Sequence, residues 1–252
     1  MKRKTEIWAH RGASGYAPEN TLEAFRKAVE MKADGVELDI QLTKDGELAV
    51  IHDERLDRVS DGRGYVRDFT YGELYALDVS RSMPSYGTVH IPTLAQVLEE
   101  LRPTGLSVNI ECKTGIYFYP GLEERMVRLV TDMGMTDRIW CSSFNHESVL
   151  KVKKLCPGMK TGFLVSDVIA DVADYVKSNG VDALHPTLYH MQDEGLPQRC
   201  RQRGIALHVW TVNDKEQIRS LAAAGVEAVI TNYPDVAAEA LAVFGSPDSL
   251  TV

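Results

Sequence analysis

Acidic and apolar side chains alternate in two short stretches of the sequence, residues 35–41 and residues 107–111. Both stretches have the composition of β-strands, in which successive side chains point to opposite faces. Glu37 and Asp39 therefore share one face of the first predicted strand, and Glu111 follows the same alternation in the second. We expect these three carboxylates to come together where the two strands end.

Buried carboxylates repel one another, so a cluster of three requires either a bound cation or raised pKa values. Ligation by oxygen alone favours a hard ion, Mg²⁺ or Ca²⁺, over zinc. Each acid taken alone could instead pair with Arg11 or Lys113 in a network of salt bridges. Because the same alternation occurs in two strands, we favour one divalent cation, Mg²⁺ or Ca²⁺, bound by Glu37, Asp39 and Glu111.

Two histidines are predicted to lie near the same cluster. His10 ends the first predicted strand, and His52 follows a later apolar run. Histidine titrates near neutral pH, which suits donation of a proton to one oxygen and removal of a proton from another. Arg11 and Lys113 could hold an anionic group, Arg11 through its planar guanidinium and Lys113 as a point charge. Two histidines and two cations beside a hard-metal site are suited to phosphodiester cleavage.

The elements that must position these residues are short apolar runs alternating with helix-like stretches along the whole chain. Eight strand–helix units in 252 residues are typical of a (β/α)₈ TIM barrel, an α/β fold whose active site lies at the C-terminal ends of the strands. The predicted strands are residues 6–9, 35–41, 107–111, 138–142, 161–165, 182–185, 206–210 and 228–230. The predicted helices are residues 21–32, 94–101, 122–133, 146–155, 168–178, 197–203, 214–224 and 234–243.

A ninth apolar run, residues 48–51, follows the second predicted strand after a Lys-Asp-Gly turn. A parallel crossover needs about a dozen residues or more, so this run must return antiparallel to that strand. Residues 54–92 then form a long insertion after the second strand, within a single barrel domain that covers residues 1–252. Such a segment usually caps or shapes the mouth of an active site, and a lid without substrate contact is the alternative.

The composition argues against several classes of protein. The chain has 28 Lys and Arg against 36 Asp and Glu, a formal net charge of −8 that disfavours a nucleic-acid partner. No apolar run approaches the ~18 residues that cross a bilayer, or the ~7–15 residues of a secretory signal. The four cysteines are far apart and form no C-x-x-C pair, so we expect reduced thiols. These features predict a cytoplasmic protein without stable membrane insertion.

Several short motifs follow one another in a particular order. In the first part of the chain they are His10-Arg11-Gly12, Pro18-Glu19-Asn20-Thr21, Glu37-Leu38-Asp39 and the stretch from Gly46 to His52-Asp53. In the second part they are Glu111-Cys112-Lys113, Ser142-Ser143-Phe144, Trp210-Thr211-Val212-Asn213 and Thr231-Asn232-Tyr233-Pro234. Over nearly the whole chain, this order closely resembles the glycerophosphodiester phosphodiesterase family of the PI-PLC-like phosphodiesterase superfamily.

The resemblance implies a TIM barrel, a bound divalent cation and an enzymatic activity. The implied reaction is the hydrolysis of glycerophosphodiesters, such as glycerophosphocholine or glycerophosphoethanolamine, to sn-glycerol 3-phosphate and the free alcohol. Position by position, the resemblance implies that Glu37, Asp39 and Glu111 bind the metal. It also implies that His10 and His52 form the acid/base pair.

The resemblance further implies which residues contact the substrate. Arg11 and Lys113 match the cations that contact the phosphate, while Phe144 and Trp210 match residues that line the pocket. His185 is a small departure, because relatives often carry an amide side chain at this position.

Two alternative functions use the same residues. A lysophospholipase D-like phosphodiesterase would act on single-chain lipids and would need an apolar trough, which residues 65–86 could supply. A non-catalytic barrel would bind phosphorylated ligands or serve as an interaction scaffold. Two histidines beside three carboxylates argue against the non-catalytic barrel, because a binding protein needs no acid/base pair.

Three further residues have predicted roles that the structure can test. Asn20 is better explained as the cap of a helix than as a ligand. Glu19 begins no helix, and it is a candidate hydrogen-bond partner of the site. His208 shares its strand face with Trp210, and we expect it to be packed in the core.

Overall fold

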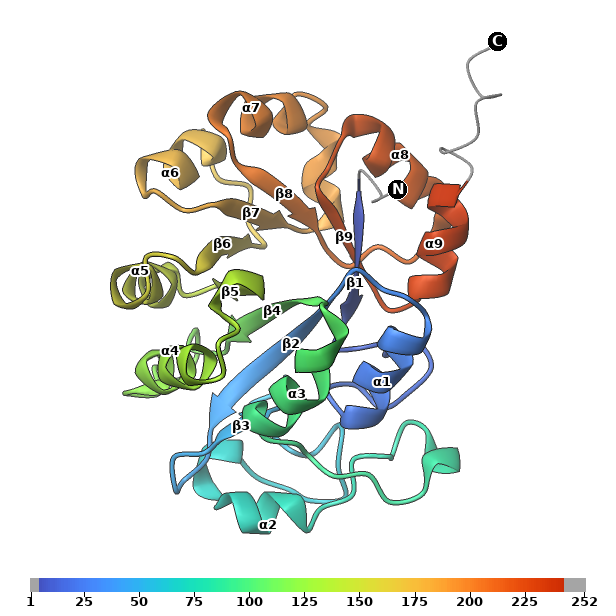
Figure 1. Ribbon diagram of the computed structural model, residues 1–252, viewed down its shortest axis with the longest axis vertical. Helices are drawn as coiled ribbons and strands as arrows, with labels where there is room; N and C mark the ends of the chain where they lie inside the picture. The colour runs from blue at the N-terminus through green and yellow to red at the C-terminus, as the bar shows by residue number, and fades with distance from the viewer. Residues whose placement is uncertain (1–4, 243–252) are drawn as a thin grey trace.

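The protein, described here by a computed structural model of residues 5–242, is built around a closed barrel of parallel strands (Figure 1). The barrel strands are β1 (Glu6–His10), β2 (Gly35–Leu42), β4 (Ser107–Cys112), β5 (Ile139–Ser143), β6 (Lys160–Val165), β7 (Ala183–Pro186), β8 (Ala206–Val209) and β9 (Ala228–Thr231). Pairing of β1 with both β2 and β9 closes the ring. The predicted TIM barrel is confirmed, and each predicted strand agrees with the structure to within one residue at either end.

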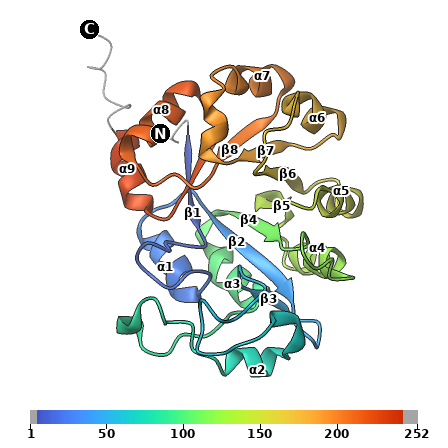
Figure 2. The same ribbon diagram turned by 180° about the vertical axis from the view of Figure 1, so that it is seen from behind.

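Helices surround the barrel, as the view from behind also shows (Figure 2). Val36, Leu38 and Ile40 on the outer face of β2 belong to a buried hydrophobic cluster that includes side chains of the surrounding helices. The α-helices of this ring are α1 (Leu22–Glu30), α3 (Leu94–Leu101), α4 (Leu122–Asp132), α5 (His146–Leu155), α6 (Val172–Ser178), α7 (Leu196–Arg203), α8 (Lys215–Ala224) and α9 (Pro234–Ala242). Short 3₁₀ helices are η1 (Val66–Asp68), η2 (Pro84–Tyr86), η3 (Arg102–Thr104), η4 (Thr136–Arg138) and η5 (Leu188–Gln192). Within residues 5–242, every helix is too short or too polar to cross a membrane.

One predicted helix begins later than expected. The sequence pattern placed its start at Val168, whereas α6 starts at Val172. Asp171, directly before α6, has a left-handed backbone with a φ of 49°, which a right-handed helix cannot include. Residues 168–171 therefore belong to the loop that follows β6, at the C-terminal end of the barrel.

The ninth apolar run forms β3 (Leu48–Val50), which pairs antiparallel with β2. In the turn between the two strands, Gly46 has a φ of 86°, a conformation that glycine adopts without steric cost. The predicted hairpin is thus confirmed. β3 lies outside the ring of eight, so it does not alter the barrel.

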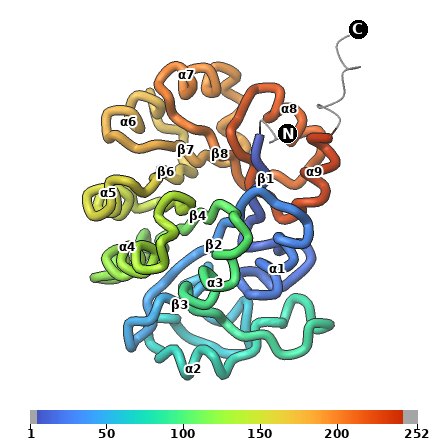
Figure 3. The backbone as a smooth tube through the Cα atoms, viewed as in Figure 1, coloured from blue at the N-terminus to red at the C-terminus, as the bar shows by residue number. Residues whose placement is uncertain are grey.

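Residues 54–92 lie beside the barrel, next to β3 and α1 (Figure 3). They contain η1, α2 (Tyr71–Tyr75) and η2, and their apolar side chains form a small hydrophobic cluster together with Ala49 and Ile51. Leu56, Val66 and Leu74 are fully buried in this cluster. The Tyr86 hydroxyl donates a hydrogen bond to the Tyr16 carbonyl oxygen, which attaches the segment to the loop between β1 and α1. The segment is therefore an ordered part of the fold.

Two histidines pack against each other inside the barrel. Nδ1 of His208 lies 2.9 Å from Nε2 of His185, and the indole of Trp8 packs against His208 with ring centroids 4.4 Å apart. The expectation that His208 is a packed core residue is confirmed. Burial lowers the pKa of His185 to about 3, and burial together with His185 lowers the pKa of His208 well below its usual value. A Cβ atom at Gly162 would lie 2.4 Å from Nε2 of His185, so this pair requires glycine on the neighbouring strand.

This buried pair predicts that acid destabilises the protein. Below pH ~6.5, both imidazoles are protonated in the unfolded chain but stay neutral in the native state. The free energy of unfolding is therefore full above that pH and decreases as the pH falls toward the native pKa values. In this pH range, each histidine should lower the free energy of unfolding by about 1.4 kcal/mol for each pH unit of acidification. Denaturant unfolding at several pH values should give a shallower pH dependence for His208→Gln than for the native sequence. Parallel pH profiles of the two proteins would contradict this prediction.

Candidate active site

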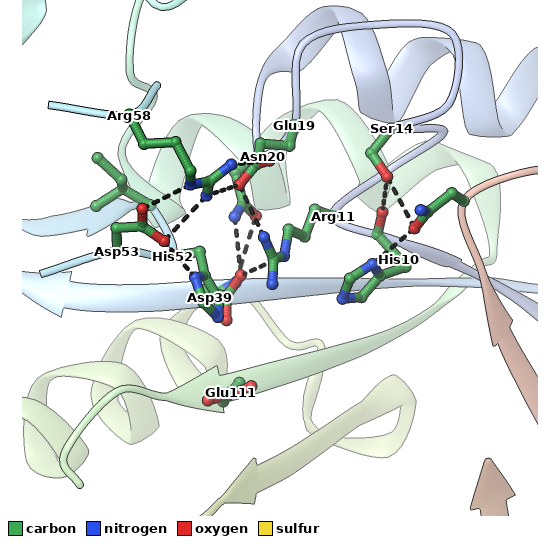
Figure 4. Close-up of polar contacts among 12 residues, drawn as sticks. His10, Arg11, Ser14, Glu19, Asn20, Asp39, His52, Asp53, Arg58 and Glu111 are labelled. Atoms are coloured by element: carbon green, nitrogen blue, oxygen red, sulfur yellow. Dashed lines mark hydrogen bonds and ion pairs between the residues drawn. The ribbon is translucent and has the colours of Figure 1, made fainter. Parts of the chain in front are cut away.

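The C-terminal ends of β2 and β4 carry the predicted acidic cluster. Asp39 lies opposite Glu111 across this parallel strand pair, and Glu37 precedes Asp39 by two residues on the same face. One oxygen from each carboxylate lies within 4.8 Å of the other two. The exposed fractions of Glu37, Asp39 and Glu111 are 5%, 1% and 8%. The structure therefore brings the three predicted metal ligands together, as Figure 4 shows for Asp39 and Glu111.

Asp39 is held from the loop between β1 and α1. The Asn20 side-chain amide donates a hydrogen bond of 2.8 Å to Oδ2 of Asp39, and Nε of Arg11 lies 3.5 Å from the same oxygen. The expectation that Asn20 caps a helix is wrong, because Thr21 is the N-cap of α1 and accepts a hydrogen bond from the Ala24 backbone N–H. Asn20 has a left-handed backbone with a φ of 59°, and its side chain is used for the acidic cluster instead.

The three carboxyl groups differ in their electrostatic surroundings. Burial, with the charges of Asp39 and Glu111, raises the pKa of Glu37 well above its usual value. Burial and Asp39 likewise raise the pKa of Glu111. Burial also acts to raise the pKa of Asp39, but Arg11 and the other nearby cations outweigh it and lower that pKa. Oδ1 of Asp39 is buried and has no hydrogen-bond partner among residues 5–242. A hard divalent cation fits this donor set, because it would offset the repulsion and bind that oxygen.

His10 lies at one side of the cluster. Its Nδ1 is 2.7 Å from the amide oxygen of Asn232, an acceptor, so Nδ1 carries the proton in this contact. Its Nε2 lies 4.0 Å from Glu37 Oε2. Burial and the charge of Arg11 lower the pKa of His10 to about 4, so its imidazole is neutral at pH 7. The Ser14 hydroxyl lies 2.7 Å from the His10 carbonyl oxygen and 3.2 Å from Oδ1 of Asn232, and its one proton is donated to the nearer acceptor or shared between the two (Figure 4). Sequence reasoning assigned Asn232 no role, although it lies in one of the motifs quoted above.

His52 lies at the other side of the cluster, beyond Arg11 and Asp39 in Figure 4. Its Nδ1 is 2.7 Å from Oδ1 of Asp53, and its Nε2 is 3.2 Å from the Lys113 ammonium. A carboxylate can only accept and an ammonium can only donate, so this arrangement selects the tautomer with the proton on Nδ1. Lys113 also lies 3.0 Å from Oε1 of Glu111. Both predicted catalytic histidines and Lys113 are therefore placed at the acidic cluster.

Glu19 is a hydrogen-bond partner of the site, as predicted. It accepts a hydrogen bond of 2.8 Å from Arg11 NH1, and it also contacts Arg58 from the 54–92 segment. The Arg11 backbone N–H donates a hydrogen bond to Oε2 of Glu37. Arg11 itself has a left-handed backbone with a φ of 53°. Asp53 and Arg58 had no assigned role in the sequence analysis. Asp53 directly follows His52 in one of the motifs quoted above, whereas the contacts of Arg58 depend on how the 54–92 segment folds, which no local pattern indicated.

A cavity beside the acidic cluster has polar and apolar walls. Its lining residues are His10, Arg11, Glu37, His52, Asn109, Glu111, Leu164, Trp210 and Ile230. Trp210 donates a hydrogen bond of 2.8 Å from Nε1 to the His185 carbonyl oxygen, whereas the His185 imidazole pairs with His208 inside the barrel. Phe144, predicted to line the pocket, packs edge-on against Trp210 with ring centroids 5.6 Å apart and is 40% exposed. Phe144 is thus in contact with the lining residue Trp210 but does not itself belong to the lining of this cavity.

Comparisons with known proteins identify the family of this chain. The glycerophosphoryl diester phosphodiesterase family model matches residues 10–236. The chain is 41% identical over 233 residues to a glycerophosphodiester phosphodiesterase of Caldanaerobacter subterraneus, covering 92% of this chain and 96% of that protein. It is 40% identical over 240 residues to a glycerophosphodiester phosphodiesterase of Bacillus altitudinis, with 92% and 96% covered. An Oleispira antarctica phosphodiesterase, solved in complex with the product sn-glycerol-3-phosphate, aligns with a TM-score of 0.84 and 28% identity over 94% of this chain and 96% of that one. The chain therefore belongs to the glycerophosphoryl diester phosphodiesterase family of enzymes.

Proposed function

We propose that the protein hydrolyses glycerophosphodiesters, such as glycerophosphocholine or glycerophosphoethanolamine, to sn-glycerol 3-phosphate and the free alcohol in a metal-dependent reaction. The observation that carries this proposal is the cluster of three buried carboxylates within 4.8 Å of one another. A histidine lies on either side of that cluster (Figure 4). The product bound to the Oleispira antarctica phosphodiesterase supports the same choice of substrate.

The proposed cation is Mg²⁺ or Ca²⁺, held by Glu37, Asp39 and Glu111. When bound, such an ion withdraws charge from a phosphate oxygen and so favours attack at phosphorus. Arg11 and Lys113 would hold the remaining phosphate charge, because both cations are fixed beside the carboxylates by hydrogen bonds and ion pairs.

The proposed acid/base pair consists of His10 and His52. Each imidazole has its Nδ1 atom against an oxygen acceptor, Asn232 for His10 and Asp53 for His52. Proton exchange with substrate would then occur at the Nε2 atom of each ring, which in His52 must first give up its contact with the Lys113 ammonium. One histidine would remove a proton from the nucleophile, and the other would protonate the departing alcohol. Each role typically contributes ~10²–10⁴-fold in rate.

A second candidate is a lysophospholipase D-like activity on single-chain lipids. One observation favours it: large exposed aliphatic and phenylalanine side chains occur in the loops after β4, β5 and β6, three neighbouring strands. These side chains are Ile116, Phe118, Phe144, Val168 and Ile169. They would suit an acyl chain, but the polar cavity wall favours the small substrate as our principal proposal.

We also propose that the protein acts in the cytoplasm. Within residues 5–242, the four cysteines are free, and three of them are buried. Reduced thiols are typical of proteins in a reducing compartment. The formal net charge of −8 continues to disfavour a nucleic-acid partner.

Binding of the cation should stabilise the protein, because it offsets repulsion between the buried carboxylates. We expect millimolar Mg²⁺ or Ca²⁺ to raise the melting temperature of the metal-stripped protein. Asp39→Asn should reduce this increase strongly, and the matched control Asp132→Asn, at an exposed position of α4, should preserve it. Differential scanning fluorimetry would measure all three proteins. An equal increase in all three would remove Asp39 from the proposed metal site.

The central test of function is the release of choline and sn-glycerol 3-phosphate from glycerophosphocholine. We expect turnover with Mg²⁺ or Ca²⁺, loss of turnover after thorough chelation, and recovery on adding the metal back. Lysophosphatidylcholine at equal concentration serves as the comparison, and it should react more slowly. Undiminished activity in metal-free protein would refute the metal role. A strong preference for the lipid would favour the second candidate, and inactivity toward every phosphodiester would favour a binding protein.

Replacement of His52 should affect catalysis more than substrate binding. We expect His52→Ala to lower kcat by ~10²–10⁴-fold with a much smaller change in KM, because the imidazole transfers a proton only in the transition state. His90→Ala is the matched control, since His90 stacks on Tyr75 within residues 54–92. Steady-state kinetics with glycerophosphocholine would measure both variants. A change confined to KM would limit His52 to a binding role.

A further inference from the structure

Arg58 lies in the 54–92 segment, outside the acidic cluster, yet it contacts two carboxylates at once. Its Nε donates to Oδ2 of Asp53 at 2.6 Å, and its NH2 donates to Oδ1 at 2.9 Å. Its NH1 and NH2 atoms donate to the two Glu19 oxygens at 2.8 and 2.7 Å. Figure 4 shows the guanidinium between these two acids. Arg58 therefore makes a two-point contact with each of them.

Each of these acids in turn holds a residue of the proposed site. Oδ1 of Asp53 lies 2.7 Å from Nδ1 of His52, and Oε1 of Glu19 accepts a hydrogen bond of 2.8 Å from Arg11. One guanidinium therefore connects the supports of a predicted catalytic histidine and of a predicted phosphate-contacting arginine. Because both contacts are bidentate, they restrict rotation of each carboxylate as well as its distance.

The charges explain why a cation is required at this point. Glu19 and Asp53 both face the Arg58 guanidinium, and without it their negative charges would repel each other across the same space. Rotation of Asp53 away from Glu19 would release Nδ1 of His52. Arg58 offsets this repulsion and leaves each acid oriented toward its own partner.

The loop that carries Arg58 is itself held in place. Leu56 and Ser60, two residues to either side, are fully buried. The Ser60 backbone N–H and hydroxyl both donate to the Leu56 carbonyl oxygen, at 3.0 and 2.9 Å. Arg58 therefore projects from a closed turn with two buried ends, one of which, Leu56, belongs to the small hydrophobic cluster.

We propose that Arg58 is a positioning residue for catalysis, which orients His52 through Asp53 and Arg11 through Glu19. This inference rests on the proposed function for its kinetic consequences. It also gives the 54–92 segment a defined part in the active site, as the source of a side chain that holds two of its groups without contacting the phosphodiester itself.

The kinetic test compares Arg58→Ala with Arg55→Ala. Arg55 lies on the same segment, has a similarly exposed side chain (51% against 49% for Arg58) and pairs with Asp57 instead. We expect Arg58→Ala to lower kcat/KM for glycerophosphocholine by ~10–100-fold, the range typical of losing a hydrogen-bond partner that orients the ligands of a metal site. Arg55→Ala should remain within about twofold, since exposed ion pairs contribute little.

A rescue experiment distinguishes positioning from general structural damage. Millimolar guanidinium should restore part of the activity of Arg58→Ala, because the free ion can occupy the space between Glu19 and Asp53. It should not restore the double variant Arg58→Ala/Asp53→Ala, which lacks one of the two acids. The Arg58→Lys variant should be less active than the native protein, because an ammonium cannot form two bidentate contacts.

A spectroscopic measurement tests the inference independently of the substrate. Nitrogen-15 NMR of the histidine side chains should show His52 in the Nδ1-protonated tautomer in the native protein and in Arg55→Ala, and averaged signals in Arg58→Ala. If the native protein cleaves no glycerophosphodiester, the proposed function fails while this measurement still decides the positioning role. Native kinetics with an unchanged His52 spectrum in Arg58→Ala would overturn the inference. Activity loss without guanidinium rescue and with an unchanged spectrum would also overturn it.

Discussion

Mutual repulsion of three buried carboxylates is the constraint around which this protein is arranged. Glu37, Asp39 and Glu111 bring ligand atoms within 4.8 Å of one another in a place where water provides little screening. Arg11 and Lys113 lie against the cluster, yet the pKa values of Glu37 and Glu111 remain raised. The cations of the chain therefore offset the negative charge in part. The remaining charge is what the proposed divalent ion would neutralise.

The barrel makes this unfavourable arrangement possible. Parallel strands β2 and β4 keep Asp39 opposite Glu111 through main-chain hydrogen bonds that do not depend on the side chains. On the other face of β2, apolar side chains pack against the helices, and their burial stabilises the strand that carries the acids. Thus the apolar face of β2 stabilises the fold, and the opposite face of the same strand carries the acids that repel one another.

Around the cluster, the chain uses short polar contacts to fix each functional group in one state. His10 and His52 each have Nδ1 against an oxygen acceptor, which selects the tautomer and leaves Nε2 facing the site. The acceptors come from opposite ends of the sequence, Asn232 after β9 and Asp53 after β3. Arg58 lies one contact further from the cluster, because it donates to the Asp53 carboxylate, which is the acceptor for His52, rather than to the imidazole itself. Orientation in this site is therefore provided by groups that need not touch the substrate.

The sequence by itself determined the barrel, the hairpin and the identity of the acidic cluster. Strand alternation has a period of two, so it assigns Glu37, Asp39 and Glu111 to one face without knowledge of distant contacts. The predictions from local sequence pattern were wrong at Asn20 and at Asp171, where the backbone is left-handed. Such backbone conformations are stabilised by tertiary contacts, which a local pattern does not contain. The link from Arg58 through Glu19 and Asp53 was decided by tertiary structure alone. Those residues are far apart along the chain or lie in an irregular loop, and hydrogen bonds between loops follow no periodic pattern that a sequence can display.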